Sequence, residues 1–157
     1  MAVVTKKVFT VDRGTWLHAG TRAIDPYDRG LIKREGVKPE TVASIPSGVL
    51  LDTNLGKGMM CCLGFVCNQL GVVKKWLSGI GMPETLIQNS VTNAHKLEGI
   101  LVDAGENSSL AQAASVINDN DDITNLQREK QLIALFKKNG YTLKFTGTYP
   151  KIVNAKN

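Results

Sequence analysis

Apolar residues of the central segment recur at helical spacing, which limits how the rest of the chain can pack. Between 59 and 70 they stand at i, i+3, i+4, i+7 and i+11, the spacing that places side chains on one stripe of a helix. This stripe consists of Met59, Cys62, Leu63, Val66 and Leu70. Gly71 follows and is typical of the left-handed residue that ends a helix. We therefore predict an amphipathic helix over 59–70, with Cys62 in the core and Cys61 on its flank.

Two capping boxes predict two further helices. In this motif a serine or threonine hydroxyl accepts from the third helical N–H, and a glutamine at that position bonds back. Ser109 with Gln112 opens a short helix, whose predicted apolar face is Leu110, Ala113, Ala114 and Ile117. Thr124 with Gln127 opens a helix of about fourteen residues that stops at Asn139-Gly140, with an apolar face of Leu126, Ile133 and Phe136. Pro83 suits a first helical position and predicts a short helix over 84–89.

Strand patterns lie near both ends of the chain. Apolar and polar residues alternate imperfectly over 3–11 and more regularly over 141–145, and 49–51 is typical of a short buried strand. The simplest packing pairs the two terminal strands in one small antiparallel sheet, with three or more helices against one face. We therefore predict an α+β fold. A single domain over 1–157 is expected, because this length is typical of one domain.

Residues 19–48 contain four glycines and three prolines and predict a long loop. Loops of this length are uncommon in compact domains and are often lids or binding loops, although a poorly ordered insertion fits the pattern equally well. The loop carries Arg22, Arg29 and Arg34, which could close over an anionic ligand. At the other end, the polar segment 148–157 is predicted to be a frayed tail.

The charge of the chain is unevenly distributed. The net charge is +5 in total, made up of +3 over 1–58, −4 over 59–122 and +6 over 123–157. The basic ends are expected either to attract anions such as nucleic acid, nucleotides or phosphate, or to form a solvated lysine-rich face. The acidic run 119–122 lacks the glycine and glutamate of a calcium loop, so we expect it to link two helices.

Composition excludes several classes of protein. Hydrophobic residues make up 43% and charged residues 21%, which is typical of a globular domain. The apolar runs are shorter than the ~20 residues of a membrane span. The N-terminus lacks the basic segment followed by an apolar one that marks a signal peptide. We therefore expect a cytoplasmic protein.

The cysteines and histidines do not form a recognisable metal or catalytic motif. Cys61, Cys62 and Cys67 contain no C-x-x-C pair, and His18 and His95 are isolated. An odd number of cysteines without a signal peptide favours reduced thiols. Sequence motifs of serine hydrolases, zinc proteases and dinucleotide enzymes are also missing. We therefore expect no metal, no cofactor and no enzymatic activity.

The turn after the first strand holds the best candidate for a ligand site. Arg13 can form bidentate hydrogen bonds to a carboxylate or phosphate, Trp16 can stack on a base, and His18 can donate or accept a hydrogen bond. The alternative is that Trp16 belongs to the core and Arg13 pairs with an acid such as Asp12 or Asp119. The predicted ligand-binding residues are Arg13, Trp16, His18, Arg22, Arg29, Arg34, Asn118 and Asp119.

Several short motifs are spread along the chain. They are Asp12-Arg13-Gly14-Thr15-Trp16, Met60-Cys61-Cys62-Leu63-Gly64, Ile117-Asn118-Asp119, and Leu135-Phe136 ahead of Gly140. In this order they resemble an uncharacterised family of small proteins from phages and other mobile elements. The loop 19–48 is longer than in that family, and Gly14 stands where a side chain is more usual. The resemblance implies a phage-type origin and action in the host cytoplasm, and it implies no particular activity.

Three functions are compatible with these features. The first is non-enzymatic capture of a small anionic, nucleotide-like ligand, which could sequester a host immune signal as an anti-defence sponge. The second is a protein-binding accessory or inhibitor factor acting on a host protein, with the stripe over 72–77 and its Trp76 as the best feature. The third is nucleic-acid binding by the C-terminal basic block, although no known binding motif is present. The sequence favours the first and leaves a homo-oligomer open.

Overall fold

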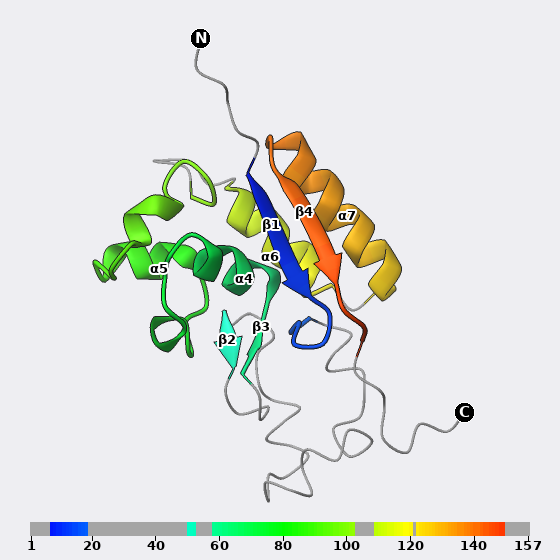
Figure 1. The fold of residues 1–157 in the computed structure, drawn as a ribbon. Coiled ribbons are helices and arrows are strands. Elements are labelled where there is room, and N and C mark those ends of the chain that lie inside the picture. Colours follow the sequence, from blue (N-terminus) through cyan, green and yellow to red (C-terminus); the bar gives the residue numbers. More distant parts are fainter. Residues whose placement is uncertain (1–6, 19–49, 53–57, 103–108, 121, 150–157) are drawn as a thin grey trace, which may run out of the picture.

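The computed structural model describes residues 7–18, 50–52, 58–102, 109–120 and 122–149 of the chain (Figure 1). In chain order its elements are β1 (Val8–Asp12), β2 (Leu51–Asp52), β3 (Met59–Met60), α4 (Cys62–Gln69), the 3₁₀ turn η1 (Lys74–Trp76), α5 (Pro83–Gln88), the 3₁₀ turn η2 (Ala94–Leu97), α6 (Leu110–Asn118), α7 (Asn125–Lys138) and β4 (Thr142–Thr146). Helices and a small sheet occur together, so the predicted α+β class is confirmed. The predicted loop 19–48 lies outside the described residues. No helix within the described ranges is long and apolar enough to cross a membrane.

The two terminal strands pair with each other, but the predicted antiparallel direction is wrong. β1 and β4 run parallel, with Val8 opposite Thr142 and Asp12 opposite Thr146. All the helices lie between these strands in the sequence, so no hairpin turn forces the strands to run in opposite directions. A tight turn through Gly140, with φ of +89°, instead reverses the chain from α7 into β4. A second, antiparallel pair joins β2 and β3.

The helices cover one face of the β1–β4 pair. α7 packs on β4, α4 packs on β1, and α6 contacts both helices (Figure 1). Phe9, Val11 and Leu143 point into this layer and are buried, whereas Val8 and Lys144 are exposed on the outer face. The ring of Phe9 meets that of Phe136 edge-on, with centroids 6.3 Å apart. The core therefore lies between the sheet and the three helices.

Helix α4 is shorter and more deeply buried than predicted. Met59 and Met60 form β3 instead of the first helical turn, and Met60 bonds with the chain that follows β1 through Leu17 N–H and Thr15 C=O. The helix is buried along its length up to Cys67, so it has no continuous solvent-facing side. Gly64 permits this burial, because a Cβ there would lie 2.0 Å from the Leu50 carbonyl oxygen.

The predicted bounds of α7 are confirmed, but of its predicted apolar face only Phe136 is buried. The helix spans Asn125–Lys138, and Thr124 forms both halves of the capping box. Its buried residues are Arg128, Glu129, Leu132 and Phe136. Leu126 and Ile133, which were predicted to face the core, are 63% and 39% exposed. The helix is rotated because Arg128 and Glu129 find polar partners inside the protein.

The shorter helices follow their local signals more closely. α5 begins with Pro83 at its first position, as predicted. The Ser109 side chain accepts from the Gln112 N–H at 3.2 Å, which confirms the predicted N-cap of α6. The buried face of α6 differs from the prediction, since Ala113 is exposed while Ala111, Ala114 and Asn118 are buried. The acidic run after α6 lies between α6 and α7 as expected, although residue 121 lies outside the described ranges.

Candidate functional site

Five of the eight predicted ligand-binding residues lie together in the structure. Arg13, Trp16 and His18 belong to the chain after β1, where Asp12 closes a turn by accepting from the Gly14 N–H at 2.9 Å. Asn118, at the end of α6, meets this segment through Trp16 and the Leu17 carbonyl, and its amide also donates to the adjacent Asp119. The other three, which are Arg22, Arg29 and Arg34, lie outside the described residues.

Arg13 makes a bidentate ion pair within the protein. Its Nε and Nη2 donate to the two carboxylate oxygens of Glu129 at 2.9 and 2.7 Å, and its Nη1 donates to the Gly147 carbonyl at 3.1 Å. The Tyr149 hydroxyl donates to the same carboxylate. Arg13 therefore pairs with an acid, as the alternative predicted, but the acid is Glu129 of α7 and not Asp12 or Asp119. Tyr149, which was predicted to be in a frayed tail, is held by this pair.

The three side chains of this cluster alter one another's pKa values. Burial alone would raise the pKa of Glu129, but the hydrogen bonds from Arg13 and Tyr149 bring it below its ordinary value. The hydrogen bond to Glu129 raises the pKa of Arg13. Burial, together with the neighbouring carboxylate, raises the pKa of Tyr149. The cluster therefore holds a charged Arg13–Glu129 pair and a neutral Tyr149 at neutral pH.

Trp16 is fully buried, so the alternative that it belongs to the core is confirmed. Its indole packs on the rings of His18 and Phe145, with centroids 4.3 and 4.8 Å away. Its Nε1–H donates to Asn118 Oδ1 at 2.8 Å, and the backbone N–H of Cys62 donates to the same oxygen at 3.3 Å. The indole face is thus used for internal packing and offers no open surface for stacking on a base.

A buried arginine that the sequence analysis missed lies beside His18. Arg128 is fully buried, and its Nη1 donates to Asn125 Oδ1 at 2.7 Å and lies 3.5 Å from His18 Nδ1. Its Nη2 donates to the carbonyls of Asn120 and Ile123. The guanidinium therefore ties the acidic link after α6 to the first turn of α7. Glu129 was missed as well, although it is the one acidic residue between 123 and 157.

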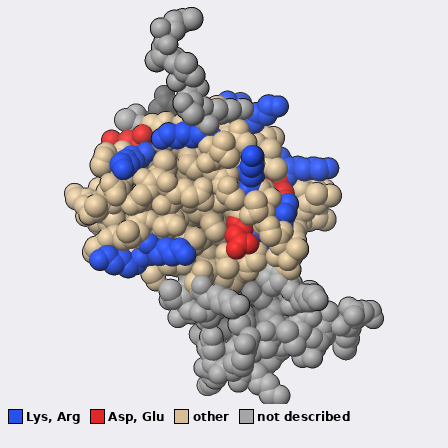
Figure 2. Space-filling view, viewed as in Figure 1, with Lys and Arg blue, Asp and Glu red and all other residues tan. Residues whose placement is uncertain are grey.

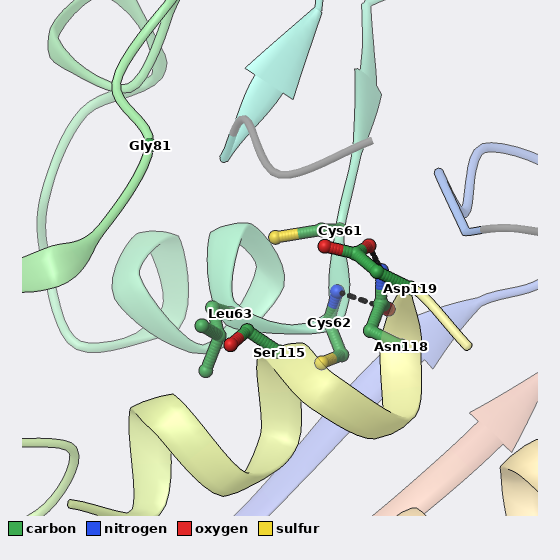
Figure 3. Close-up of a pocket in the computed structure, with 7 residues that line it drawn as sticks. All are labelled: Cys61, Cys62, Leu63, Gly81, Ser115, Asn118 and Asp119. Carbon is green, nitrogen blue, oxygen red and sulfur yellow. Dashed lines mark hydrogen bonds between the residues drawn. The ribbon is translucent and has the colours of Figure 1, made fainter. Parts of the chain in front are cut away.

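A small pocket lies between the start of α4 and the end of α6 (Figure 3). Its lining includes Cys61, Leu63, Ser115 and Asp119, and its empty space is about 200 Å³ with open solvent included. Pockets for small molecules usually enclose about 300–1,000 Å³. The lining contains the carboxylate of Asp119 and no cationic side chain. This pocket is therefore poorly suited to an anionic nucleotide.

The cysteines of this region are buried thiols. Burial raises the pKa of Cys61 to about 12, despite hydrogen bonds from backbone N–H groups of the first turn of α4 that lower it. Burial also raises the pKa values of Cys62 and Cys67. Such thiols stay protonated at neutral pH and are weak nucleophiles and weak metal ligands. Among the described residues no group of His, Cys, Asp and Glu is placed to hold a metal ion.

Two exposed apolar surfaces lie outside this cluster. The first follows α7, where Leu126 and Ile133 share one stripe with Lys130 and Lys137 at spacings of four and three residues; we call this the α7 stripe. The second is at η1, where Val73 is 49% and Trp76 is 45% exposed. The predicted Trp76 feature is therefore present, although its neighbours Val72 and Leu77 are buried.

Comparisons with known proteins give no relative. No protein-family model, no curated protein and no solved structure matches this chain.

Proposed function

We propose that this chain is a non-enzymatic protein-binding factor that acts through the α7 stripe. The observation that carries the proposal is the position of Leu126 and Ile133, which are exposed on a helix whose core-facing side is already filled. Large apolar side chains that stay exposed on a well-packed helix are unfavourable in water and become favourable when a partner protein buries them. Lys130 and Lys137 on the same stripe would add charge selectivity.

Capture of a nucleotide-like ligand is less well supported by the geometry. The proposed ligand contacts of Arg13 and Trp16 are taken up by Glu129 and Asn118 inside the protein. A ligand phosphate would have to displace the Glu129 carboxylate, with which Arg13 already forms two charge-assisted hydrogen bonds. The loop arginines of that hypothesis lie outside the described residues, so ligand capture stays a prediction.

Nucleic-acid binding is also less well supported. Figure 2 shows Lys and Arg side chains around the margins of one face, with a wide uncharged area between them. A nucleic-acid surface usually gathers its basic residues in one patch or groove.

The resemblance to small phage proteins would make the expected protein partner a component of the host cell.

The test is site-specific photo-crosslinking of the full chain in host cells. A photoreactive phenylalanine analogue replaces Ile133 on the α7 stripe, and the control places it at Lys96, which is exposed in η2 beside α5. We expect a discrete protein adduct from position 133 and none from position 96. The proposal would be wrong if position 133 gave no adduct, and a nucleotide that raised the melting temperature of the purified chain would then favour ligand capture.

A further inference from the structure

We propose that the partner segment is an acidic amphipathic helix, which packs lengthwise on the α7 stripe and forms a short coiled coil with α7. This inference rests on the proposed function and names the shape and the charge of the partner. Helices recognise one another through apolar side chains at heptad spacing and through charged residues among or beside them. The α7 stripe has both features.

The spacing of the α7 stripe is that of a coiled-coil seam. Its residues follow one another at intervals of four, three and four positions, in the order Leu126, Lys130, Ile133 and Lys137. This alternation keeps side chains on the line that faces a second helix, with the apolar residues at one heptad position and the lysines at the other. α7 is fourteen residues long, so it presents two such heptads. An extended partner would not match this spacing, since the side chains of a strand alternate every two residues.

The α7 stripe is accessible along its length. All four of its residues are exposed, whereas the opposite side of the helix is buried against α6 and β4. α7 accordingly forms one side of the fold in Figure 1. On the solvent side the stripe is flanked by Gln127 and Ala134, which carry no charge. Small or neutral flanking residues allow a second helix to approach closely. The described part of the chain thus leaves room for a helix on this stripe.

The two lysines select the charge of the partner. A lysine in a helix–helix seam costs stability when the facing helix buries it without a carboxylate. Among the described residues neither Lys130 nor Lys137 has an ion-pair partner, and their neighbours three and four positions away on α7 are uncharged. The one carboxylate of α7, that of Glu129, is buried and already binds Arg13. A glutamate opposite each lysine would supply the charge that the described residues do not.

A second copy of α7 fits the stripe poorly. Parallel copies would place lysine opposite lysine, and antiparallel copies would place each lysine opposite Leu126 or Ile133. In neither arrangement does a lysine meet a free carboxylate, because Glu129 is bound within its own chain. A different chain avoids both problems if it places apolar residues opposite Leu126 and Ile133 and glutamates opposite the lysines. The charges therefore favour an acidic partner over self-association.

Designed peptides test the shape and charge of the partner on the full-length chain. Two peptides of about three heptads alternate leucine and glutamate at the spacing of the stripe, one for each direction of packing, with alanine and glutamine elsewhere. We expect at least one to bind with a Kd below about 100 μM and to gain helical circular dichroism on mixing. The controls are a scrambled peptide of the same composition and a version with a central proline. Neither should bind below about 1 mM.

Charge reversal tests the role of the lysines. Lys130→Glu with Lys137→Glu should weaken binding of the acidic peptide about tenfold or more, and it should allow a peptide with lysine in place of glutamate to bind instead. The matched control is Lys74→Glu with Lys75→Glu in η1, which changes the net charge equally and should leave binding unchanged. All four lysines are exposed, so we expect both variants to fold, and their melting temperatures verify this.

The adduct from crosslinking at position 133 extends the test to the natural partner. Mass spectrometry of the adduct identifies the partner segment that lies against Ile133. We expect this segment to carry apolar and acidic residues at alternating intervals of four and three, as a helix on the α7 stripe requires. We also expect Lys130→Glu with Lys137→Glu to remove the adduct, and Lys74→Glu with Lys75→Glu to preserve it.

Several outcomes would overturn the acidic helix without overturning the proposed function. These are equally tight binding of the scrambled or the proline peptide, binding that survives charge reversal on α7, and no peptide binding below about 1 mM. An adduct that maps to a basic or an extended partner segment would do the same. A crosslink from position 133 to a second copy of the chain would assign the stripe to self-association. Failure of the crosslinking at position 133 would overturn the proposed function itself.

Discussion

At the residue scale, Arg13 joins three parts of the chain that are distant in sequence. Its guanidinium contacts α7 through Glu129 and the end of β4 through the Gly147 carbonyl, and Tyr149 shares the same carboxylate. The Arg13 side chain is 28% exposed and that of Glu129 is 9% exposed, so the pair is partly shielded from water. Shielding strengthens the attraction and also makes loss of one partner costly.

Removal of Arg13 should therefore destabilise the protein. We expect Arg13→Ala to lower the free energy of unfolding by about 2 kcal/mol, because Glu129 would keep its partly buried charge without its ion-pair partner. Urea denaturation of the purified chain measures this change. The control is Lys96→Ala, at an exposed site, which should change it by less than about 0.5 kcal/mol. Equal effects of the two substitutions would contradict a structural role for the ion pair.

The same pair should make stability depend on acid pH. The pKa of Glu129 is lowered in the folded state, so the folded protein favours its charged form. This contribution is fully present above the pKa that the residue has when unfolded, near the ordinary value of 4.5, and is lost as pH falls through the lower folded value. We expect Glu129→Gln to cost stability at pH 7 and progressively less below pH 4.5. Urea midpoints measured across acid pH test this, and a variant whose deficit stays constant with pH would contradict it.

At the element scale, α7 shows which features of the fold local sequence determines. Its start at Thr124 and its end before Gly140 were predicted because capping and chain reversal depend on neighbouring residues. Its orientation was not predicted, because Leu126 and Ile133 are as apolar as the residues that are buried. The helix turns Arg128 and Glu129 inward because partners from the chain after β1 and from the link after α6 satisfy them. Those partners are distant in sequence, so no periodicity within the helix indicates them.

Substitutions on neighbouring residues of α7 distinguish the observed face from the predicted one. Leu132 is fully buried, and we expect Leu132→Ala to lower the free energy of unfolding by about 2–5 kcal/mol. Ile133 is 39% exposed, and we expect Ile133→Glu to change it by less than about 1 kcal/mol. Chemical denaturation of both variants provides the comparison. Equal destabilisation by the two substitutions would support the prediction from the sequence that Ile133 faces the core.

At the scale of the whole molecule, the sheet and the candidate site depend on contacts between the two ends of the chain. The terminal strands were predicted to pair, but their parallel direction depends on how the helices carry the chain across, which strand patterns do not encode. Of the residues predicted around Arg13 and Trp16, His18, Asn118 and Asp119 lie with them, and the three loop arginines lie outside the described residues. Their partners Glu129 and Tyr149 were missed, because a carboxylate in a basic helix and a tyrosine in a polar tail are ordinary surface residues by sequence. The sequence thus indicated where polar side chains gather more reliably than what they bind.

The β1 edge of the sheet leads to a last prediction about the whole molecule. Gln69 closes the β1 edge with two hydrogen bonds to Thr10, so Gln69→Ala should leave that edge open. We expect the Thr10 amide to exchange about tenfold or more faster, because its acceptor is gone. The variant should also self-associate at high protein concentration, since an unblocked strand edge pairs readily with another chain.

Hydrogen exchange and sedimentation velocity measure these two effects of Gln69→Ala. The control is Gln131→Ala, at an exposed position of α7, which should leave both unchanged. Faster exchange at Thr10 without self-association would mean that one open edge does not suffice for pairing between copies. Unchanged exchange at Thr10 would contradict the role of Gln69 as the block.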